Sequence, residues 1–121
     1  SVGGYQITNG SLYLDSGRGY TLSGEVKPEL CAPAVRIFGP GLHNTYVTRT
    51  GTSAAAAITA GACAQIMQWG FVKKNQIFMS SADIKNMLIR GAKRADDRIY
   101  PNSSWGYGIL DVYQAFENLR K

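Results

Sequence analysis

One serine in this chain has neighbours that could support nucleophilic chemistry. Ser53 lies between Gly51-Thr52 and a long run of uncharged residues that predicts a helix. A serine at the start of a helix lies beside backbone N–H groups without partners and beside the positive end of the helix dipole. Both would stabilise an oxyanion forming next to its Oγ. The position equally suits an N-cap, the commonest role of serine there, so these residues alone leave both interpretations open.

The other reactive side chains form no recognisable site by their spacing. His43 is the single histidine, ten residues before Ser53, and we expect it in a surface loop. Cys31 and Cys63 make neither a Cys-x-x-Cys motif nor a zinc-binding spacing. Their apolar surroundings favour buried thiols over a disulfide. No carboxylates gather at calcium-ligand spacing, so we expect no metal site and no cofactor.

Length and composition predict one globular domain. The 121 residues are 45% hydrophobic and 17% charged, and a chain of this length can bury roughly two thirds of its unfolded surface. The net charge of +5 arises partly in residues 85–98, where five basic side chains accompany two acidic ones. No aromatic residues interleave with these charges. We therefore expect a solvated helix face there and no nucleic-acid partner.

The run that follows the serine is unusual in having no charge. Residues 53–72 are long enough to span a bilayer, but most of them are alanine or glycine, and glutamines interrupt them. We therefore expect no membrane span and instead a helix buried on every side, as at the centre of a larger domain. The chain begins with Ser1 and not with methionine, which fits a processed product or one piece of a longer protein.

The pattern of residues predicts strands before Ser53 and helices after it. The expected strands are residues 2–7, 11–14, 32–38 and 45–50, with a turn at Thr8-Asn9-Gly10. A capping-box pattern from Ser80 to Asp83 predicts a helix with one apolar face, made of Ile84, Met87, Leu88 and Gly91. A last helix near Asp111 would place together Ile109, Val112, Tyr113 and Phe116. This order of elements predicts an α/β layer architecture.

Several segments, in this order, resemble the C-terminal part of the catalytic domain of subtilisin-like serine proteases. That family has a Ser-x-Arg-Gly turn, a Lys-Pro-(Asp/Glu)-x-x-Ala-Pro segment, a Gly-Thr-Ser motif opening the central helix and a Gly-rich turn before a closing helix. The matching segments here are Ser16–Gly19, Lys27–Pro33, Gly51–Ser53 and Trp105–Gly108. The all-alanine stretch after the serine, with the closing helix, looks most like the clostridial branch that includes the Csp-type spore-germination proteases.

The resemblance implies a fold and roles for three residues. The whole chain, residues 1–121, would be the C-terminal segment of a subtilisin-like α/β domain, with a mainly parallel sheet and a central buried helix starting at Ser53. Ser53 would be the acylating nucleophile, and its own N–H would be one oxyanion donor. Thr52 would offer a supporting hydroxyl, and Gly51 would let the backbone pass close to the substrate.

The same resemblance implies that the general base and its acid lie elsewhere. In the family order of Asp, His and Ser, the histidine starts its own helix far upstream, so His43 does not match it; Asn44 and Asp15 match no triad or oxyanion position either. A serine hydroxyl is a weak nucleophile without a base. We therefore expect this chain alone to be inactive, and to act on a polypeptide substrate only with an upstream segment of the same precursor that carries Asp and His.

Two further expectations depend on that upstream segment. The clostridial resemblance implies a secreted or spore-associated protein. The alternative to a serine endopeptidase is a pseudoprotease that keeps the fold as a binding or regulatory scaffold. An upstream segment with Asp, His and the oxyanion Asn would favour the enzyme, whereas their loss would favour the scaffold.

Overall fold

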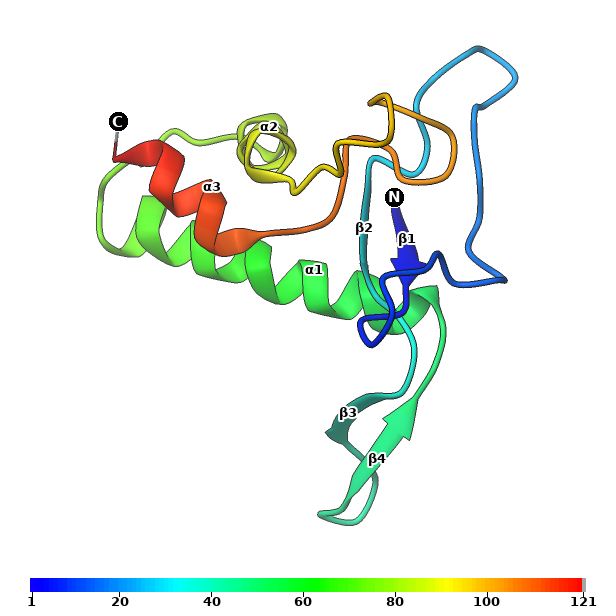
Figure 1. The fold of residues 1–121 in the computed structure, drawn as a ribbon. Coiled ribbons are helices and arrows are strands. Elements are labelled where there is room, and N and C mark those ends of the chain that lie inside the picture. The colour runs from blue at the N-terminus through cyan, green and yellow to red at the C-terminus, as the bar shows by residue number, and fades with distance from the viewer. Residues whose placement is uncertain (121) are drawn as a thin grey trace.

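The computed structural model describes residues 1–120, in which a small parallel sheet and a separate hairpin accompany three α-helices (Figure 1). The elements in chain order are β1 (Val2–Tyr5), β2 (Leu30–Pro33), β3 (Ile37–Pro40), β4 (Tyr46–Arg49), α1 (Thr52–Met67), the π-helical turn η1 (Gln68–Val72), α2 (Ser81–Gly91) and α3 (Val112–Leu119). The predicted mixed α/β architecture, with strands before Ser53 and helices after it, is confirmed.

The sheet is built from strands that are distant in sequence. β1 and β2 pair in parallel, with Val2 opposite Leu30 and Tyr5 opposite Pro33. The chain before α3 adds to the other edge of β2 through a parallel bridge between Cys31 and Ile109. These strands are short and almost fully buried at their centres, as expected for parallel strands covered by helices.

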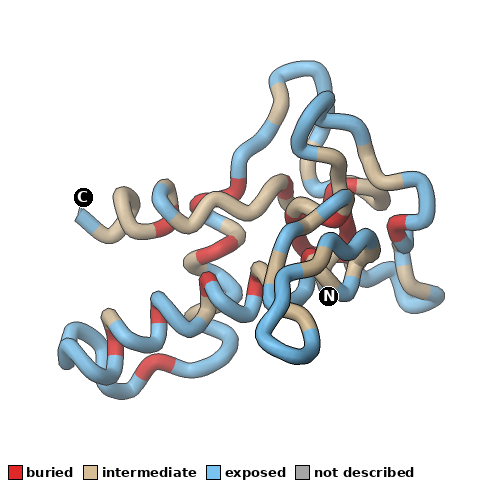
Figure 2. Tube along the Cα trace, turned by 90° about the horizontal axis from the view of Figure 1, so that it is seen from below, coloured by how far each residue is buried: buried red, intermediate tan, exposed pale blue. Residues whose placement is uncertain are grey.

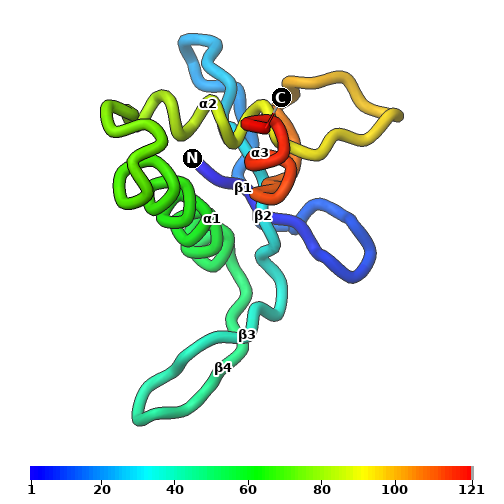
Figure 3. The backbone as a smooth tube through the Cα atoms, turned by 90° about the vertical axis from the view of Figure 1, so that its left-hand side faces the viewer, coloured from blue at the N-terminus to red at the C-terminus, as the bar shows by residue number. Residues whose placement is uncertain are grey.

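The strand predicted over residues 32–38 is wrong, because the chain bends in its middle. β2 ends at Pro33 and β3 begins at Ile37. Between them Arg36 has a φ of 54° and its backbone N–H donates to Thr50 Oγ1, at 2.9 Å. A residue in the left-handed region interrupts a strand. The chain therefore leaves the sheet and forms the β3–β4 hairpin, which projects from the body of the molecule (Figure 3).

Helix α1 is buried on one face only. Its buried residues recur at helical spacing and contact the sheet and α2: Ala55, Thr59, Ala62 and Ile66. The opposite face, including Ala56, Ala60 and Gly61, is exposed (Figure 2). Burial on every side is thus wrong for the described residues, because they provide packing partners for a single face. By length and composition Thr52–Val72 could also cross a membrane, but in this fold its buried face forms part of the core.

Helices α2 and α3 begin as their sequences predict. Ser80 and Asp83 form a reciprocal capping box at the start of α2, and Asp111 accepts from the Gln114 N–H at the start of α3. The two helices pack closely where Gly91 faces Ala115, since a Cβ on this glycine would lie 2.6 Å from the Ala115 nitrogen. The face predicted for the last helix is wrong at two residues. Ile109 lies before α3, in bridges to Cys31 and Lys93, and the side chain of Tyr113 is 72% exposed, whereas Ala115 is the buried residue of α3.

Both cysteines are free thiols. Cys31 is fully buried between β1 and the chain before α3, and burial raises its pKa to about 12. Cys63 is half-buried on α1, and burial raises the pKa of its thiol as well. The prediction of thiols in apolar surroundings is confirmed for Cys31 and holds in part for Cys63.

Candidate active site around Ser53

The start of α1 is held against the end of β2 by backbone contacts. The Gly51 N–H donates to the carbonyl of Ala34, which directly follows β2, at 2.7 Å. Gly51 has a φ of 149°, a conformation that residues with a Cβ rarely adopt, and it occupies the N-cap position of α1. This glycine turns the chain from the hairpin into the helix and so fixes where Ser53 lies.

Ser53 is the second residue of α1 and is exposed to solvent. The N-cap is Gly51, without a side-chain cap hydrogen bond, so the interpretation of Ser53 as an N-cap is wrong. A serine that capped the helix would turn its Oγ back onto backbone N–H groups. The hydroxyl of Ser53 makes no such contact within the described residues and faces solvent at the helix end.

The backbone N–H groups at this end of α1 have the arrangement of an anion site. The first amide of the helix that finds a backbone acceptor is that of Ala54, 3.1 Å from the Gly51 carbonyl. Within residues 1–120 the amides of Thr52 and Ser53 have no acceptor. Unpaired amides at a helix N-terminus lie at the positive end of the helix dipole with their N–H groups free to donate. They therefore suit a developing oxyanion.

Thr52 faces another direction from Ser53. Its methyl group lies 3.5 Å from the position that a Cβ on Gly4 would occupy, which places it against β1. Its side chain, together with Arg18 and Lys27, also lines a small cavity of about 240 Å³ on the sheet side. Among the described residues its hydroxyl has no hydrogen-bond partner, so its supporting role in catalysis stays a prediction.

The remaining polar candidates lie apart from any reactive constellation. His43 is exposed in the loop that joins β3 to β4, at the end of the projecting hairpin (Figure 1). Asn44 is its exposed neighbour, and both have positive φ angles. Asp15 is exposed and its contact within the described residues is the hydroxyl of Tyr13, at 3.5 Å. None of them lines the groove that contains Ser53.

A groove of about 520 Å³ runs between the hairpin and the start of α1, and Ser53 forms part of its wall. The hairpin contributes Ile37, Gly39, Pro40, Val47 and Arg49, and the helix side contributes Thr50, Ser53, Ala54, Ala57 and Ile58. Sequence reasoning missed this groove, although the β-branched residues of the hairpin and the alanines after Ser53 were visible in the sequence. The exposed serine thus lies in a mostly apolar depression large enough for side chains of another molecule.

The other segments that resemble the family pattern lie close to one another behind the site, near Glu29. The Glu29 carbonyl accepts from the Tyr107 N–H at 2.7 Å, and the Gly19 N–H donates to the carbonyl of Ser103 at 2.9 Å. Segments Ser16–Gly19, Lys27–Pro33 and Trp105–Gly108 are therefore neighbours in space. Together they surround β2, which belongs to the second of them, and residues of the first two line a cavity with Thr52 at the start of α1.

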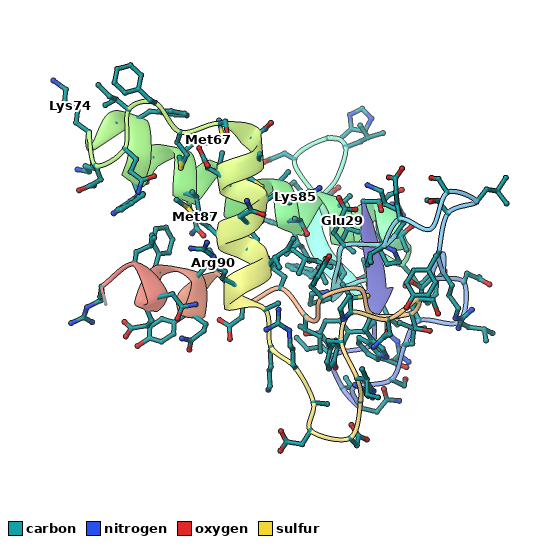
Figure 4. All side chains as sticks on the ribbon, turned by 90° about the horizontal axis from the view of Figure 1, so that it is seen from above. Glu29, Met67, Lys74, Lys85, Met87 and Arg90 are labelled. Carbon is teal, nitrogen blue, oxygen red and sulfur yellow. The ribbon has the colours of Figure 1, made fainter. Side chains whose placement is uncertain are left out.

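The carboxylate of Glu29 is a buried charge that sequence reasoning did not identify. It lies 3.1 Å from the Nζ atoms of both Lys27 and Lys85, and it also contacts the backbone nitrogen of Ser1. Figure 4 labels Glu29 and Lys85. Burial alone would raise the pKa of Glu29, but the hydrogen bonds from Ser1, Lys85 and Lys27 outweigh it and hold this pKa well below its usual range. Lys85 is exposed, as predicted for a solvated helix face, and its ammonium also joins α2 to Glu29, the residue before β2.

The profile of the Subtilase family matches residues 1–108 of this chain. Among solved structures, the Clostridium perfringens CspB protease superposes with a TM-score of 0.95 at 36% sequence identity, over 100% of this chain and 26% of that one. Two more distant structures share the fold. The prenylagaramide maturation protease PagA has a TM-score of 0.77 at 22% identity, over 98% of this chain and 41% of PagA. The PatG macrocyclase domain has a TM-score of 0.76 at 21% identity, over 96% of this chain and 34% of PatG.

A search of curated protein sequences found no match. The chain spans about a quarter of the length of the CspB protease that it resembles. The 36% sequence identity, over the whole of this chain, agrees with the resemblance to the clostridial branch. The matched residues include Ser53 and the segments that support it. By this profile match and this structural likeness, the chain belongs to the subtilase family.

Proposed function

We propose that this chain supplies the nucleophile of a subtilisin-like serine endopeptidase. The observation that carries the proposal is the position of Ser53, exposed in the first turn of α1 beside two amides that have no acceptor within residues 1–120. The family match supports it, because the Gly51–Ser53 motif lies inside the matched residues. A solvent-facing hydroxyl next to a ready oxyanion site suits acyl transfer better than a capping role.

The proposed reaction is peptide-bond hydrolysis in two steps. The Ser53 Oγ attacks the carbonyl carbon of the scissile bond, and its proton passes through a histidine to the leaving amine as the C–N bond breaks. Water then attacks the acyl ester, which releases the new carboxylic acid and restores the Ser53 hydroxyl. The Ser53 N–H would donate to the oxyanion in both steps, and Gly51 would leave room for the substrate backbone.

The general base belongs, in this proposal, to a segment that precedes these residues in the full-length protein. The exposed face of α1 agrees with packing against such a segment, because alanine and glycine there allow another backbone to approach closely. His43 is excluded from this role in the proposal, since it lies at the far end of the hairpin and outside the groove.

Labelling with a fluorophosphonate probe tests the proposal, because the probe forms a stable ester only with an activated serine. We expect the full-length protein to be labelled at Ser53, as located by peptide mass spectrometry. The Ser53→Ala variant should take up no label, and Ser81→Ala, which removes an exposed hydroxyl at the start of α2, should be labelled normally. A full-length protein that carries upstream Asp and His yet resists the probe would instead be a pseudoprotease scaffold.

A further inference from the structure

The groove beside Ser53 contains a single charged side chain among the described residues that line it. Strand alternation places Arg49 on the same face of the hairpin as Val47 and its direct cross-strand partner Ile37. That face is turned toward α1 and lines the groove. The opposite face carries Phe38 and Tyr46, stacked with ring centroids 5.2 Å apart. The register of the hairpin therefore delivers the Arg49 guanidinium to the side on which Ser53 lies.

Arg49 has no carboxylate partner in the part of the chain that the structure describes. The salt bridges of residues 1–120 end on Glu29 or Glu117, and neither of these residues lines the groove. Arg94 donates to the carbonyls of Ile89 and Tyr107, and Arg98 lies over the Trp105 ring, but none of the other arginines of residues 1–120 lines this groove. Arg49 thus adds an unneutralised cation to a mostly apolar wall.

We propose that Arg49 selects peptide substrates that carry an Asp or Glu side chain in this groove, close to the bond that Ser53 would cleave. The proposal rests on the proposed function and adds a substrate class to it. Arg49 is exposed in the described residues, so its guanidinium is free to bind a carboxylate through two parallel N–H···O hydrogen bonds, which a bound peptide would partly desolvate and so strengthen. The apolar wall formed by Ile37, Val47 and Ile58 would exclude water around the pair and hold the aliphatic part of the bound chain.

Cleavage of defined peptide libraries tests the substrate class. Each library contains eight-residue peptides of uncharged residues with Glu, Gln or Lys fixed at one position, and the full-length protein cleaves them while mass spectrometry locates the broken bonds. We expect the Glu library to be cleaved about 5- to 50-fold faster than the Gln library at one fixed position near the scissile bond. The Lys library should be the slowest at that position, because like charges repel.

Substitutions assign the preference to Arg49. Arg49→Gln should abolish the difference between the Glu and Gln libraries, and Arg49→Lys should restore part of it. The matched control is Arg36→Gln, which removes an equal charge directly before the hairpin, at an exposed residue that does not line the groove; the preference should survive there. Equal cleavage of the Glu and Gln libraries, or the same loss in both variants, would overturn the inference.

A binding measurement separates this inference from the proposed reaction. Full-length Ser53→Ala protein is immobilised, and retention of the same libraries is measured without any cleavage. If this protein retains the Glu library and the added Arg49→Gln substitution abolishes the retention, the inference is supported. This holds even if the protein with Ser53 resists the fluorophosphonate probe, and in that case only the proposed reaction fails. Conversely, the protein could be labelled by the probe and cleave peptides, yet show no Glu preference in cleavage or in retention. That result would support the reaction and contradict the inference.

Discussion

The Gly51 N–H donates to the Ala34 carbonyl, and this 2.7 Å hydrogen bond joins the first turn of α1 to the end of β2. Ala34 is fully buried, so one side of this contact is fixed by the core. The other side is a glycine with a φ of 149°, two residues before the serine. The position of Ser53 therefore depends on a buried strand and a special backbone conformation, and little on its own side chain.

Gly51→Ala is expected to disturb the site more than the fold. A Cβ at this φ imposes backbone strain of roughly 1–3 kcal/mol, and relief of the strain would move the amides of Thr52 and Ser53. We expect a lower rate of fluorophosphonate labelling of the full-length protein together with a lower free energy of unfolding in urea. Gly17→Ala is the matched control, because this glycine has open space around its Cβ position, has no positive φ and does not line the groove. Equal labelling rates in both variants would contradict the role of Gly51.

Gly4→Ala should destabilise the support of the site through close packing. A Cβ on Gly4 would lie 2.3 Å from the Cβ of Ala34 and 3.5 Å from the Thr52 methyl group. The Cβ of Ala34 cannot rotate away, so the strand must shift, and overpacking of this kind costs about 1–3 kcal/mol. Urea unfolding of the full-length protein measures the loss. Gly17→Ala, with no atom near its Cβ position, should stay within about 0.5 kcal/mol of the unsubstituted protein.

Local signals in the sequence predicted the helices well. The capping box of Ser80 and Asp83 and the N-cap Asp111 were predictable because each acts over three residues of chain. The strand break at Arg36 was not, since it depends on Thr50, fourteen residues away, which accepts from its N–H. The one-sided burial of α1 could not be predicted either, because uncharged alanines fit both a covered and an open face.

In the candidate site, too, the residues with local sequence signals were predictable and those that depend on distant contacts were not. Ser53 was identified from the residues around it, and the family resemblance gave it a role. Its place as the second helical residue, behind Gly51, required the backbone geometry of the turn. Arg49 and Glu29 carried no local signal, because one depends on the register of a hairpin and the other on lysines that approach from separate segments. Long-range contacts of this kind lie outside the reach of sequence periodicity.

Glu29→Gln should lower stability and change its pH dependence. The neutral amide keeps the size of the side chain but loses charge-assisted hydrogen bonds from Lys27 and Lys85, which we expect to cost about 1–3 kcal/mol at pH 7. The pKa of Glu29 is lower in the folded state, so the unfolded chain binds more protons at acid pH. Its stabilisation is therefore complete above the unfolded pKa of about 4.3 and is lost progressively as the pH falls below it.

Unfolding of the full-length protein in urea at pH 3, 4, 5 and 7 measures this dependence. The difference in stability between the unsubstituted protein and Glu29→Gln should be largest at pH 7 and shrink toward pH 3. Glu25→Gln is the matched control, because Glu25 is exposed and makes no salt bridge within the described residues. A difference for Glu29→Gln that is constant with pH would mean that its charge is not what stabilises the fold.

Cys31 should resist alkylation as long as β1 and β2 stay paired. Its side chain is fully buried and burial raises the pKa of its thiol to about 12, so at pH 8 only about one molecule in ten thousand carries the reactive thiolate. We expect iodoacetamide at pH 8 to leave Cys31 unmodified in the folded full-length protein and to modify it fully in urea, as read by peptide mass spectrometry. The expected protection rests on the sheet, so Gly4→Ala, which strains β1, should accelerate modification of Cys31, whereas Gly17→Ala should not. Rapid modification of Cys31 in the unsubstituted folded protein would show that this part of the sheet opens readily, and the fixed support inferred for Ser53 would then be lost with it.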